Sequence, residues 1–429
     1  MTVQKFTYRG SPKGEVFLPG DKSISHRAII IGGVSDGKLR IKNFSWGKDN
    51  LSTWKAMENL GVKIWSEGEE VIVEGRGLDG LSEPSDVLDA GNSGTTIRLL
   101  TGLLSAQEFY SVITGDRFLR KRPMGRVVNP LRKRGASIWG RKGGELAPLS
   151  ILGRKLGEFT FFMDVPSAQV KSAILLSGLN ATGPTKVVER APTRDHTERM
   201  LKYFGADIKF RYPEVLLSPG KELRPVDLTI PGDLSSAAFF IVLALILEDS
   251  EIVIRDVLLN PTRTGIIEVL RKMGANIEVI NYSEEWEPRG DLIVRSSRLK
   301  NIIIEGEDVV KSIDEIPVIA VAGVFGKGKL VVRDAGELRV KETDRIRAIV
   351  ENMKKFGVEV EEFNDGFSIQ GGTLSPPREV EVDPMGDHRI AMAFAIMGHA
   401  LRDSVVTIKD FEVVDISFPS FREKLDGLF

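Results

Sequence analysis

Acidic, amine and guanidinium side chains are most concentrated at residues 340–345, Val-Lys-Glu-Thr-Asp-Arg. If this segment begins the helix that follows, Lys341 and Arg345 are four residues apart and share one face, with Glu342 beside them. A solvated charged surface is the usual explanation for such a run. This run follows a predicted strand at 329–334 and precedes an apolar helix, which favours an acid–base or anion-binding site.

Two other predicted helix starts carry groups suited to similar chemistry. Asp314 precedes an apolar helix and is either an N-cap, the more common role of Asp in this position, or a general base. Asp387-His388-Arg389 begins the last apolar helix, where Asp387 is suited to capping. Arg389 then lies in the first turn, where a cation opposes the helix dipole. That unfavourable position indicates a cation retained for a ligand.

A basic run extends the list of cations that a ligand would meet. It contains Arg117, Arg120, Lys121, Arg122 and Arg126, followed by Arg132, Lys133 and Arg134. A nucleic-acid surface is one interpretation, but Phe118 is the one nearby aromatic that would stack on a base. A small phosphorylated metabolite fits better, because guanidinium groups bind carboxylate and phosphate through paired hydrogen bonds.

The sequence predicts six helix starts of the same type, and these helix starts must position the side chains named above. At each, a predicted strand leads into a short turn containing Pro, Gly, Asp or Ser and then into an apolar helix. Free N–H groups and the positive end of the dipole make such a start suitable for an anion. The six turns are at 19–23, 90–95, 165–169, 231–235, 312–317 and 384–389.

A second pattern repeats with the first. Five predicted helices end at a glycine that is followed by alternating apolar residues, as expected of a helix C-terminus leading into a strand. The glycines are Gly61, Gly135, Gly205, Gly274 and Gly357, separated by 69 to 83 residues. One supersecondary unit of strands and helices is therefore repeated along the chain.

The overall composition limits the possible classes of protein. The 429 residues are enough for two domains, with 42% hydrophobic and 28% charged residues. The net charge of −1 gives no overall attraction to nucleic acid or membranes. The absence of cysteine excludes disulfides, thiolate metal sites and cysteine nucleophiles. The N-terminus has no secretion-signal pattern, and the longest apolar run, 237–247, is too short to span a membrane, so a cytoplasmic protein is expected.

The two most similar turns predict the domain boundaries. Pro19-Gly20-Asp21 and Pro231-Gly232-Asp233 are 212 residues apart. Grouping the repeats by threes predicts one discontinuous domain, 1–19 with 231–429, and a second domain, 20–230. The crossings near 19–21 and 230–233 would then form a hinge, with the helix starts facing one another across a cleft.

Eight motifs in this order resemble the 5-enolpyruvylshikimate-3-phosphate synthase family. They cover nearly the whole chain and lie at 20–27, 91–98, 122–125, 166–172, 193–197, 314–315, 339–345 and 387–389. The resemblance implies an α/β (α+β) fold of two similar domains, each with three βαβαββ units in an inside-out α/β barrel. It also implies transfer of the enolpyruvyl group of phosphoenolpyruvate to the 5-hydroxyl of shikimate 3-phosphate, with release of phosphate, in aromatic amino acid biosynthesis.

The resemblance also implies binding sets for the two substrates. The shikimate 3-phosphate set is Lys22, Ser23, Arg27, Ser167, Ala168, Gln169, Arg194, Asp314 and Lys341. The phosphoenolpyruvate set is Lys22, Gly94, Arg122, Gln169, Arg345 and Arg389. The substrates are anions that must approach closely, and without cations their repulsion would reach several kcal/mol in a cleft of low dielectric constant.

The catalytic set implied by the resemblance is Asp314, Lys341, Glu342 and Lys22. In the addition step the 5-hydroxyl loses a proton and C3 of phosphoenolpyruvate gains one, and elimination of phosphate reverses this traffic. Asp314 and Glu342 are the expected proton carriers, and Lys341 can act on either substrate. Which group moves which proton stays open.

The chain departs from the family pattern at peripheral positions. Ile416 stands where some members have Lys, and Glu337 where some have Asn. Ala168 and Arg194 replace the Ser and the Ser or Tyr of enteric-type members. These differences bear on the outer contacts of the acceptor.

Two alternatives have distinct signatures. The related UDP-N-acetylglucosamine enolpyruvyl transferases have Lys-Asn where this chain has Lys22-Ser23, and usually a cysteine acid, which is absent here. An RNA-binding or RNA-end-processing protein would use the basic run at 117–134. The favoured interpretation predicts small-molecule substrates, no metal or cofactor, no nucleic-acid or membrane partner, a monomer, and inhibition by glyphosate.

Overall fold

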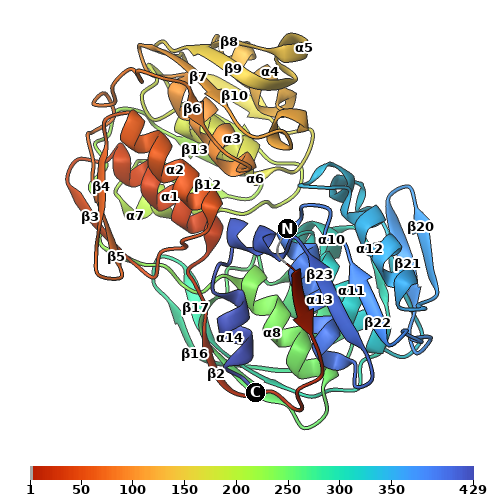
Figure 1. Ribbon diagram of the computed structural model, residues 1–429. Helices are drawn as coiled ribbons and strands as arrows, with labels where there is room; N and C mark the ends of the chain where they lie inside the picture. Colours follow the sequence, from red (N-terminus) through yellow and green to blue (C-terminus); the bar gives the residue numbers. More distant parts are fainter. Residues whose placement is uncertain (1–2) are drawn as a thin grey trace. The chain divides into compact units, whose positions relative to one another are not determined.

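The chain divides into two compact units, which are described separately. A computed structural model describes residues 3–429 (Figure 1). One unit joins Met1–Pro19 to Pro231–Phe429, and the other is Gly20–Ile230. We refer to them as the discontinuous unit and the continuous unit.

Each unit contains three repeats of one strand–helix arrangement, and the last repeat of the discontinuous unit has three strands in place of four. In the four-stranded sheets an outer strand pairs in parallel with its neighbour, and the next two pairings are antiparallel, as in the order β10-β11-β13-β12. The parallel pair requires a helical crossover and the antiparallel pair a short hairpin. The repeat is therefore βαβαββ, as predicted.

The continuous unit begins with a repeat that is closed by a strand from its far end. Its members are α1 (Lys22–Gly33), β3 (Lys38–Lys42), α2 (Lys48–Asn59), β4 (Lys63–Glu67), β5 (Glu70–Glu74) and β14 (Leu228–Thr229). The second repeat contains β6 (Leu88–Asp89), α3 (Gly94–Leu104), β7 (Tyr110–Thr114), the 3-10 helix η1 (Leu119–Lys121), α4 (Gly125–Lys133), β8 (Ser137–Gly140), α5 (Arg141–Gly144) and β9 (Leu146–Leu152). The third contains β10 (Phe159–Phe162), α6 (Ala168–Leu176), β11 (Thr185–Val188), α7 (His196–Tyr203), β12 (Ile208–Arg211) and β13 (Glu214–Leu217).

The discontinuous unit uses the N-terminal strands to complete two of its repeats. The first contains β2 (Lys13–Phe17), α8 (Leu234–Ile246), β15 (Glu251–Leu258), α9 (Gly265–Lys272), β16 (Asn276–Glu284) and β17 (Pro288–Arg295). The second contains β18 (Ile303–Ile304), α10 (Glu307–Ser312), α11 (Ile316–Phe325), β19 (Lys329–Val332), η2 (Gly336–Val340), α12 (Arg345–Lys355), β20 (Val360–Phe363) and β21 (Gly366–Gln370). The third is a three-stranded variant with β22 (Glu379–Val382), α13 (His388–Ala400), β23 (Val405–Lys409), η3 (Phe411–Ile416), α14 (Phe421–Asp426) and β1 (Val3–Phe6).

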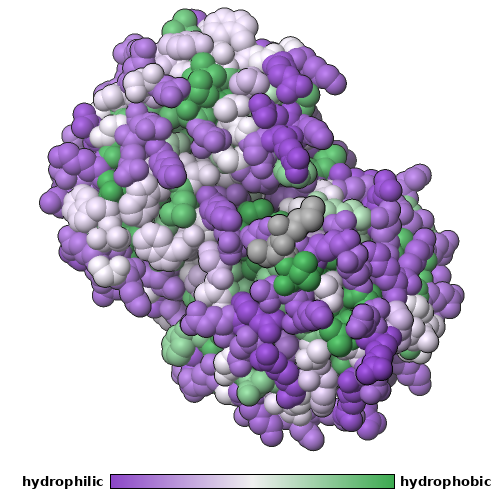
Figure 2. Space-filling view, in the orientation of Figure 1, coloured by the Kyte–Doolittle hydropathy of each residue, from purple (hydrophilic) through white to green (hydrophobic). Residues whose placement is uncertain are grey.

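The apolar helix near the start of each repeat is central to its unit. In the discontinuous unit α8, α11 and α13 pack against one another, and nearly all of their residues are buried. In the continuous unit α3 packs against both α1 and α6. Because the helices are apolar on every side, they form the core, and the sheets surround them. The surface seen in Figure 2 is largely hydrophilic, with scattered apolar residues.

The predicted turn chemistry is confirmed at the starts of the core helices and at the ends of the outer helices. All six predicted turns begin a helix, and Asp21, Ser93, Ser167, Asp233 and Asp387 cap theirs through the side chain. The five predicted terminal glycines all have positive φ, between 68° and 103°. Local residue choice therefore sets where the core helices start and where the outer helices stop.

The segments beside the unit boundary are anchored within each unit. In the continuous unit, Asn43 Nδ2 donates to the Ile230 carbonyl at 3.0 Å, and a Cβ on Gly20 would lie 1.9 Å from the Asn43 carbonyl oxygen. In the discontinuous unit, the Asp233 N–H donates to the Pro19 carbonyl at 3.0 Å. Position 20 therefore requires glycine because the backbone approaches too closely for any side chain.

Candidate active site

The start of α1 places an amine at the end of the continuous unit's core helices. Asp21 accepts the Ile24 N–H at 2.9 Å and caps the helix, so that Lys22 and Ser23 are its first residues. Lys22 Nζ lies 2.5 Å from Asp49 Oδ2. The ion pair holds Lys22 at a helix start whose N–H groups favour an anion.

The starts of α3 and α6 meet at Gln169, which belongs to both predicted sets. Arg98 donates to Gln169 Oε1 at 2.6 Å and to the Pro123 carbonyl at 3.1 Å, and Gln169 donates to Thr95 Oγ1 at 2.9 Å. Ser167 caps α6, so that Ala168 and Gln169 open it. These contacts bring guanidinium, amide and backbone N–H donors together.

Gly94 lies directly beside two guanidinium groups. A Cβ at this position would be 3.0 Å from Arg122 Cζ and 3.0 Å from an Arg98 terminal nitrogen. Arg122 also donates to the Asn92 carbonyl at 3.3 Å. Glycine therefore allows both cations to approach the first turn of α3.

Arg27 connects three helices and is only 3% exposed. It donates to Thr197 Oγ1 at 2.7 Å, to Ser172 Oγ at 2.8 Å and to the Ser23 carbonyl at 2.8 Å. The guanidinium therefore fixes α1 against α6 and α7, in addition to any contact with a ligand.

A buried polar chain joins the first three helices of the continuous unit. His26 Nδ1 lies 2.7 Å from Thr53 Oγ1, which lies 2.6 Å from Thr96 Oγ1, and Thr96 donates to Ser93 Oγ at 2.7 Å. Burial, followed by the charges of Lys22 and Arg27, holds the pKa of His26 well below its usual value. The imidazole is therefore a neutral structural group at physiological pH.

The discontinuous unit brings the 340–345 cluster to Asp314. Lys341 Nζ lies 3.4 Å from Asp314 Oδ1, and an Arg345 terminal nitrogen lies 3.5 Å from the same oxygen. Arg345 also donates to Glu342 at 2.7 Å and to Asp387 at 2.7 Å, and it is 1% exposed. Burial opposes the charge of Arg345, but Asp387, Glu342 and Asp314 outweigh it and raise its pKa. Three carboxylates are thus arranged around one permanent cation, and an amine lies beside one of them.

Arg389 joins this cluster through the helix starts. It donates to the Asp314 carbonyl at 3.1 Å and lies 3.8 Å from Glu315 Oε1. Glu315 accepts a short hydrogen bond from Ser235, which also accepts one from Arg263 at 2.8 Å. The carboxylate of Glu315 and the Asp314 carbonyl offset the unfavourable position of Arg389 at a helix N-terminus.

Two predictions about local structure in the discontinuous unit are wrong. Asp314 is not an N-cap, because α11 begins at Ile316 and Glu315 occupies the cap position. Lys341 does not share a helix face with Arg345, because α12 begins at Arg345 and Lys341 follows η2. The intervening turn bends the chain, so Lys341 and Arg345 reach Asp314 from different elements.

Two members of the basic run, Arg132 and Arg134, form hydrogen bonds that stabilise the fold. Arg134 is buried, and donates to Ser177 Oγ at 2.9 Å and to Thr185 Oγ1 at 2.8 Å. Burial lowers its pKa to about 10. Arg132 donates to the carbonyls of Ile138 and Gly143. Arg132 therefore supports the second repeat and Arg134 joins it to the third, which reduces the surface available to a nucleic acid.

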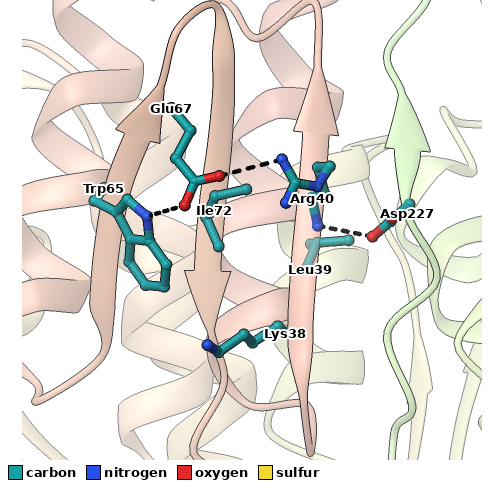
Figure 3. A pocket seen from close by; sticks show the side chains of 7 residues that line it. All are labelled: Lys38, Leu39, Arg40, Trp65, Glu67, Ile72 and Asp227. Carbon is teal, nitrogen blue, oxygen red and sulfur yellow. Dashed lines mark hydrogen bonds and ion pairs between the residues drawn. The ribbon is translucent and has the colours of Figure 1, made fainter.

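A surface pocket of about 290 Å³ lies on the sheet β14-β3-β5-β4 and contains none of the predicted site residues (Figure 3). Its charged groups bond to one another. Arg40 contacts Glu67 at 3.4 Å, and its backbone N–H donates to Asp227 at 3.0 Å. Trp65 Nε1 donates to Glu67 at 2.9 Å. The pocket wall is therefore stabilised by its own pairs.

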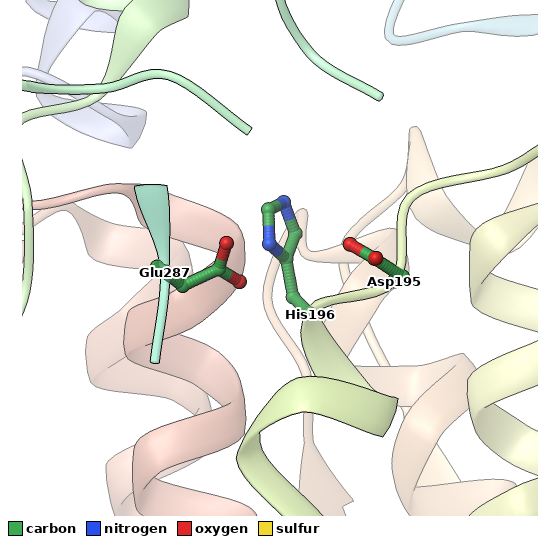
Figure 4. Close-up of side chains that lie close together, drawn as sticks. All are labelled: Asp195, His196 and Glu287. Atoms are coloured by element: carbon green, nitrogen blue, oxygen red, sulfur yellow. The ribbon is translucent and has the colours of Figure 1, made fainter. Parts of the chain in front are cut away.

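Figure 4 labels three further side chains, two carboxylates and one imidazole, that belong to different units. Asp195 accepts from Arg199 Nε at 2.9 Å, and His196 is the first residue of α7. In the discontinuous unit, Glu287 precedes β17 and accepts from Asn260 at 2.8 Å. These contacts serve a helix start and a hairpin, and the absence of a metal from the reaction stays a prediction.

Sequence reasoning missed a buried ion cluster behind Arg194. Lys171 Nζ lies 2.7 Å from Glu198 Oε1 and 3.0 Å from Glu189 Oε1. The signal was a single cation inside the otherwise apolar helix that follows Gln169. Arg194 itself lies in the irregular segment between β11 and α7.

Comparison with known proteins gives the family. Residues 8–425 match the model of EPSP synthase (3-phosphoshikimate 1-carboxyvinyltransferase). A protein of that name from Geotalea uraniireducens is 52% identical over 96% of this chain and 95% of its own, and one from Geobacter metallireducens is 50% identical over 98% of both.

Solved structures agree with this relationship. An EPSP synthase from Acinetobacter baumannii shares 41% identity, with a TM-score of 0.87 over 99% of this chain and 97% of its own. The enolpyruvyl transferase NikO from Streptomyces tendae has a TM-score of 0.78 over 99% and 97% of the two chains, at 16% identity, and thus shares the fold. The full-length match and the predicted motifs place this chain in the EPSP synthase family.

Proposed function

We infer that the protein transfers the enolpyruvyl group of phosphoenolpyruvate to the 5-hydroxyl of shikimate 3-phosphate and releases phosphate. The observation that carries this inference is the match to the EPSP synthase family over residues 8–425. The product, 5-enolpyruvylshikimate 3-phosphate, is used in the biosynthesis of aromatic amino acids.

The binding residues are proposed from the motifs and supported by the contacts within each unit. We assign Lys22, Ser23, Arg27, Ser167, Ala168, Gln169, Arg194, Asp314 and Lys341 to shikimate 3-phosphate. We assign Lys22, Gly94, Arg122, Gln169, Arg345 and Arg389 to phosphoenolpyruvate. Each substrate carries a carboxylate and a phosphate, and guanidinium groups and helix N-termini suit both groups.

The proton transfers are assigned to the cluster around Asp314. In the addition step a base takes the 5-hydroxyl proton while the hydroxyl oxygen attacks C2 of phosphoenolpyruvate and C3 receives a proton. In the elimination step C3 loses a proton and phosphate leaves. Asp314 and Glu342 are carboxylates that can accept or return a proton. Lys341 Nζ lies 3.4 Å from Asp314 Oδ1, close enough for a proton to pass between these two groups.

Expectations about oligomeric state, location and cofactors accompany this function. Among the described residues, no helix combines the length and apolar character that a bilayer span requires. We propose a monomer that works in the cytoplasm on two small-molecule substrates without a metal or cofactor. Gel filtration with light scattering tests the oligomeric state.

The function is tested by identifying the product made from each acceptor. The enzyme is incubated with phosphoenolpyruvate and either shikimate 3-phosphate or UDP-N-acetylglucosamine, and mass spectrometry detects the enolpyruvyl adduct. We expect an adduct with shikimate 3-phosphate alone. An adduct with the nucleotide sugar alone would assign the chain to the other acceptor, and salt-sensitive RNA binding without any adduct would contradict both.

A further inference from the structure

The strongest unassigned feature is the buried ion cluster of Lys171, Glu189 and Glu198 in the continuous unit. Lys171 and Glu198 are each 1% exposed and Glu189 is 7% exposed. Burial alone would lower the pKa of Lys171, but Glu198 and Glu189 raise it above its usual value. Removing charges from water is costly, so one ammonium between two buried carboxylates calls for a reason beyond packing.

The cluster holds one residue through all of its polar atoms. Glu189 Oε1 accepts the Thr193 N–H at 3.1 Å and the Thr193 hydroxyl at 2.5 Å. Lys171 Nζ donates to the Thr193 carbonyl at 3.3 Å. That carbonyl belongs to the peptide group between Thr193 and Arg194. The Lys171 ammonium therefore fixes the orientation of the peptide plane that precedes Arg194.

Lys171 lies on α6, the helix that also carries other residues proposed to bind shikimate 3-phosphate. Lys171 lies two residues after Gln169 in α6, and its backbone N–H donates to the Ser167 carbonyl at 3.0 Å. The segment 191–195 has no regular secondary structure that would fix it. The ion cluster therefore sets the distance between the start of α6 and Arg194.

We propose that Lys171 and Glu189 are positioning residues that orient Arg194, through Thr193, for shikimate 3-phosphate. This inference rests on the proposed function of the chain and on the assignment of Arg194 to the acceptor. The pair does not touch the reacting atoms. Their role is to fix the backbone before Arg194, so that less binding energy is lost in ordering this side chain.

The test uses Thr193→Val, which removes the hydroxyl and keeps the shape of the side chain. We expect the KM for shikimate 3-phosphate to rise about fivefold, the equivalent of one hydrogen bond, with the KM for phosphoenolpyruvate unchanged and the protein still folded. Thr373→Val is the matched control, because this half-buried turn threonine also donates to a carbonyl, that of Gln370 at 2.8 Å. The control should retain wild-type kinetics.

The same change is then made in the Arg194→Ala background. If Thr193 acts through Arg194, it adds no further increase in the acceptor KM there. Lys171→Met should behave in the same way, and if it does not fold, Thr193→Val still decides the matter. Three results would overturn the proposal. They are multiplying effects of the two changes on the acceptor KM, a parallel rise of both KM values in Thr193→Val, and an unchanged acceptor KM in Arg194→Ala. Failure of the proposed function is separate, because wild type and Thr373→Val would then not turn over the two substrates.

Discussion

At the residue scale, the space around Gly94 predicts how the site discriminates between anions of different length. Arg122 and Arg98 lie 3.0 Å from the position of a Cβ on this residue. A methyl group there would press on both guanidinium groups, and a close-packed site absorbs such a group only by moving a neighbour or the ligand.

Gly94→Ala should therefore weaken glyphosate more than phosphoenolpyruvate, because glyphosate is the longer molecule. We expect the wild-type enzyme to be inhibited competitively with phosphoenolpyruvate, and the inhibition constant to rise at least about tenfold in the variant. Gly157→Ala is the matched control, since a Cβ there would meet no atom within 4 Å. Resistance of the wild type, or equal loss of both ligands, would show that Gly94 does not line this wall.

Asp314→Asn tests the proton-transfer cluster by replacing one carboxylate oxygen with an NH2 group, which changes the shape of the side chain very little. The amide cannot accept a proton, so we expect kcat to fall at least about a hundredfold while the thermal midpoint stays close to that of the wild type. Asp403→Asn, in an exposed loop, should leave kcat unchanged. Turnover near normal in Asp314→Asn would remove this carboxylate from the mechanism.

At the scale of elements, the helix starts were predictable and the paths between them were not. Asp21, Ser93 and Asp387 cap their helices because short polar side chains at these positions bond to free N–H groups, which is a local effect. The path of η2 depends on Arg339, which donates to the carbonyls of Asn364 and Phe363. Because those contacts come from a distant hairpin, spacing alone placed Lys341 on the wrong element.

The buried ion cluster was missed for the same reason. Lys171 meets Glu189 and Glu198 because α6, β11 and α7 pack together, and no short motif contains all three. The chemistry-bearing residues at 340–345 and Asp314, in contrast, could be predicted from residue types and do lie together.

The end of α13 predicts a pH dependence of stability. His399 is buried between Phe6, at 5.5 Å between ring centroids, and Phe429, at 5.0 Å, and burial, with Arg422 and Arg9, lowers its pKa to about 4. The unfolded chain takes up this proton near the usual value of 6.5, so the contribution is complete above that pH and is lost as pH falls toward 4.

His399→Phe should therefore flatten this part of the stability profile. The free energy of unfolding of the wild type should fall by about 1.4 kcal/mol per pH unit more steeply than that of the variant between these limits. Denaturant unfolding at pH 5, 6, 7.5 and 8.5 measures it, and the two slopes should agree between the last two values. Equal slopes at every pH would mean that His399 takes up its proton over the same pH range in the folded and unfolded states, so that burial does not lower its pKa.

At the scale of the whole molecule, we propose that the two connections between the units act as a hinge. Gly20, Asn43 and Ile230 anchor the connections on one side, and Pro19 and Asp233 on the other. Rigid anchors beside short connections are typical of hinge motion, and a ligand that prefers one arrangement shifts the population toward it.

Small-angle scattering should then report a smaller radius of gyration when shikimate 3-phosphate is added at saturation. The physical reason is that residues from both units are assigned to this anion, so it favours a closed arrangement. Shikimate without the phosphate, at the same concentration, serves as the control. An unchanged radius of gyration at saturation would contradict a hinge at these connections.

The central claim is that residues of both units act in one reaction, and one lysine from each unit tests it. Phosphate release from phosphoenolpyruvate is measured with and without shikimate 3-phosphate for the wild type, Lys22→Met and Lys341→Met. We predict release by the wild type only when shikimate 3-phosphate is present, and a rate at least about a hundredfold lower in each variant. Release without the acceptor, or a rate near that of the wild type in either variant, would contradict the claim.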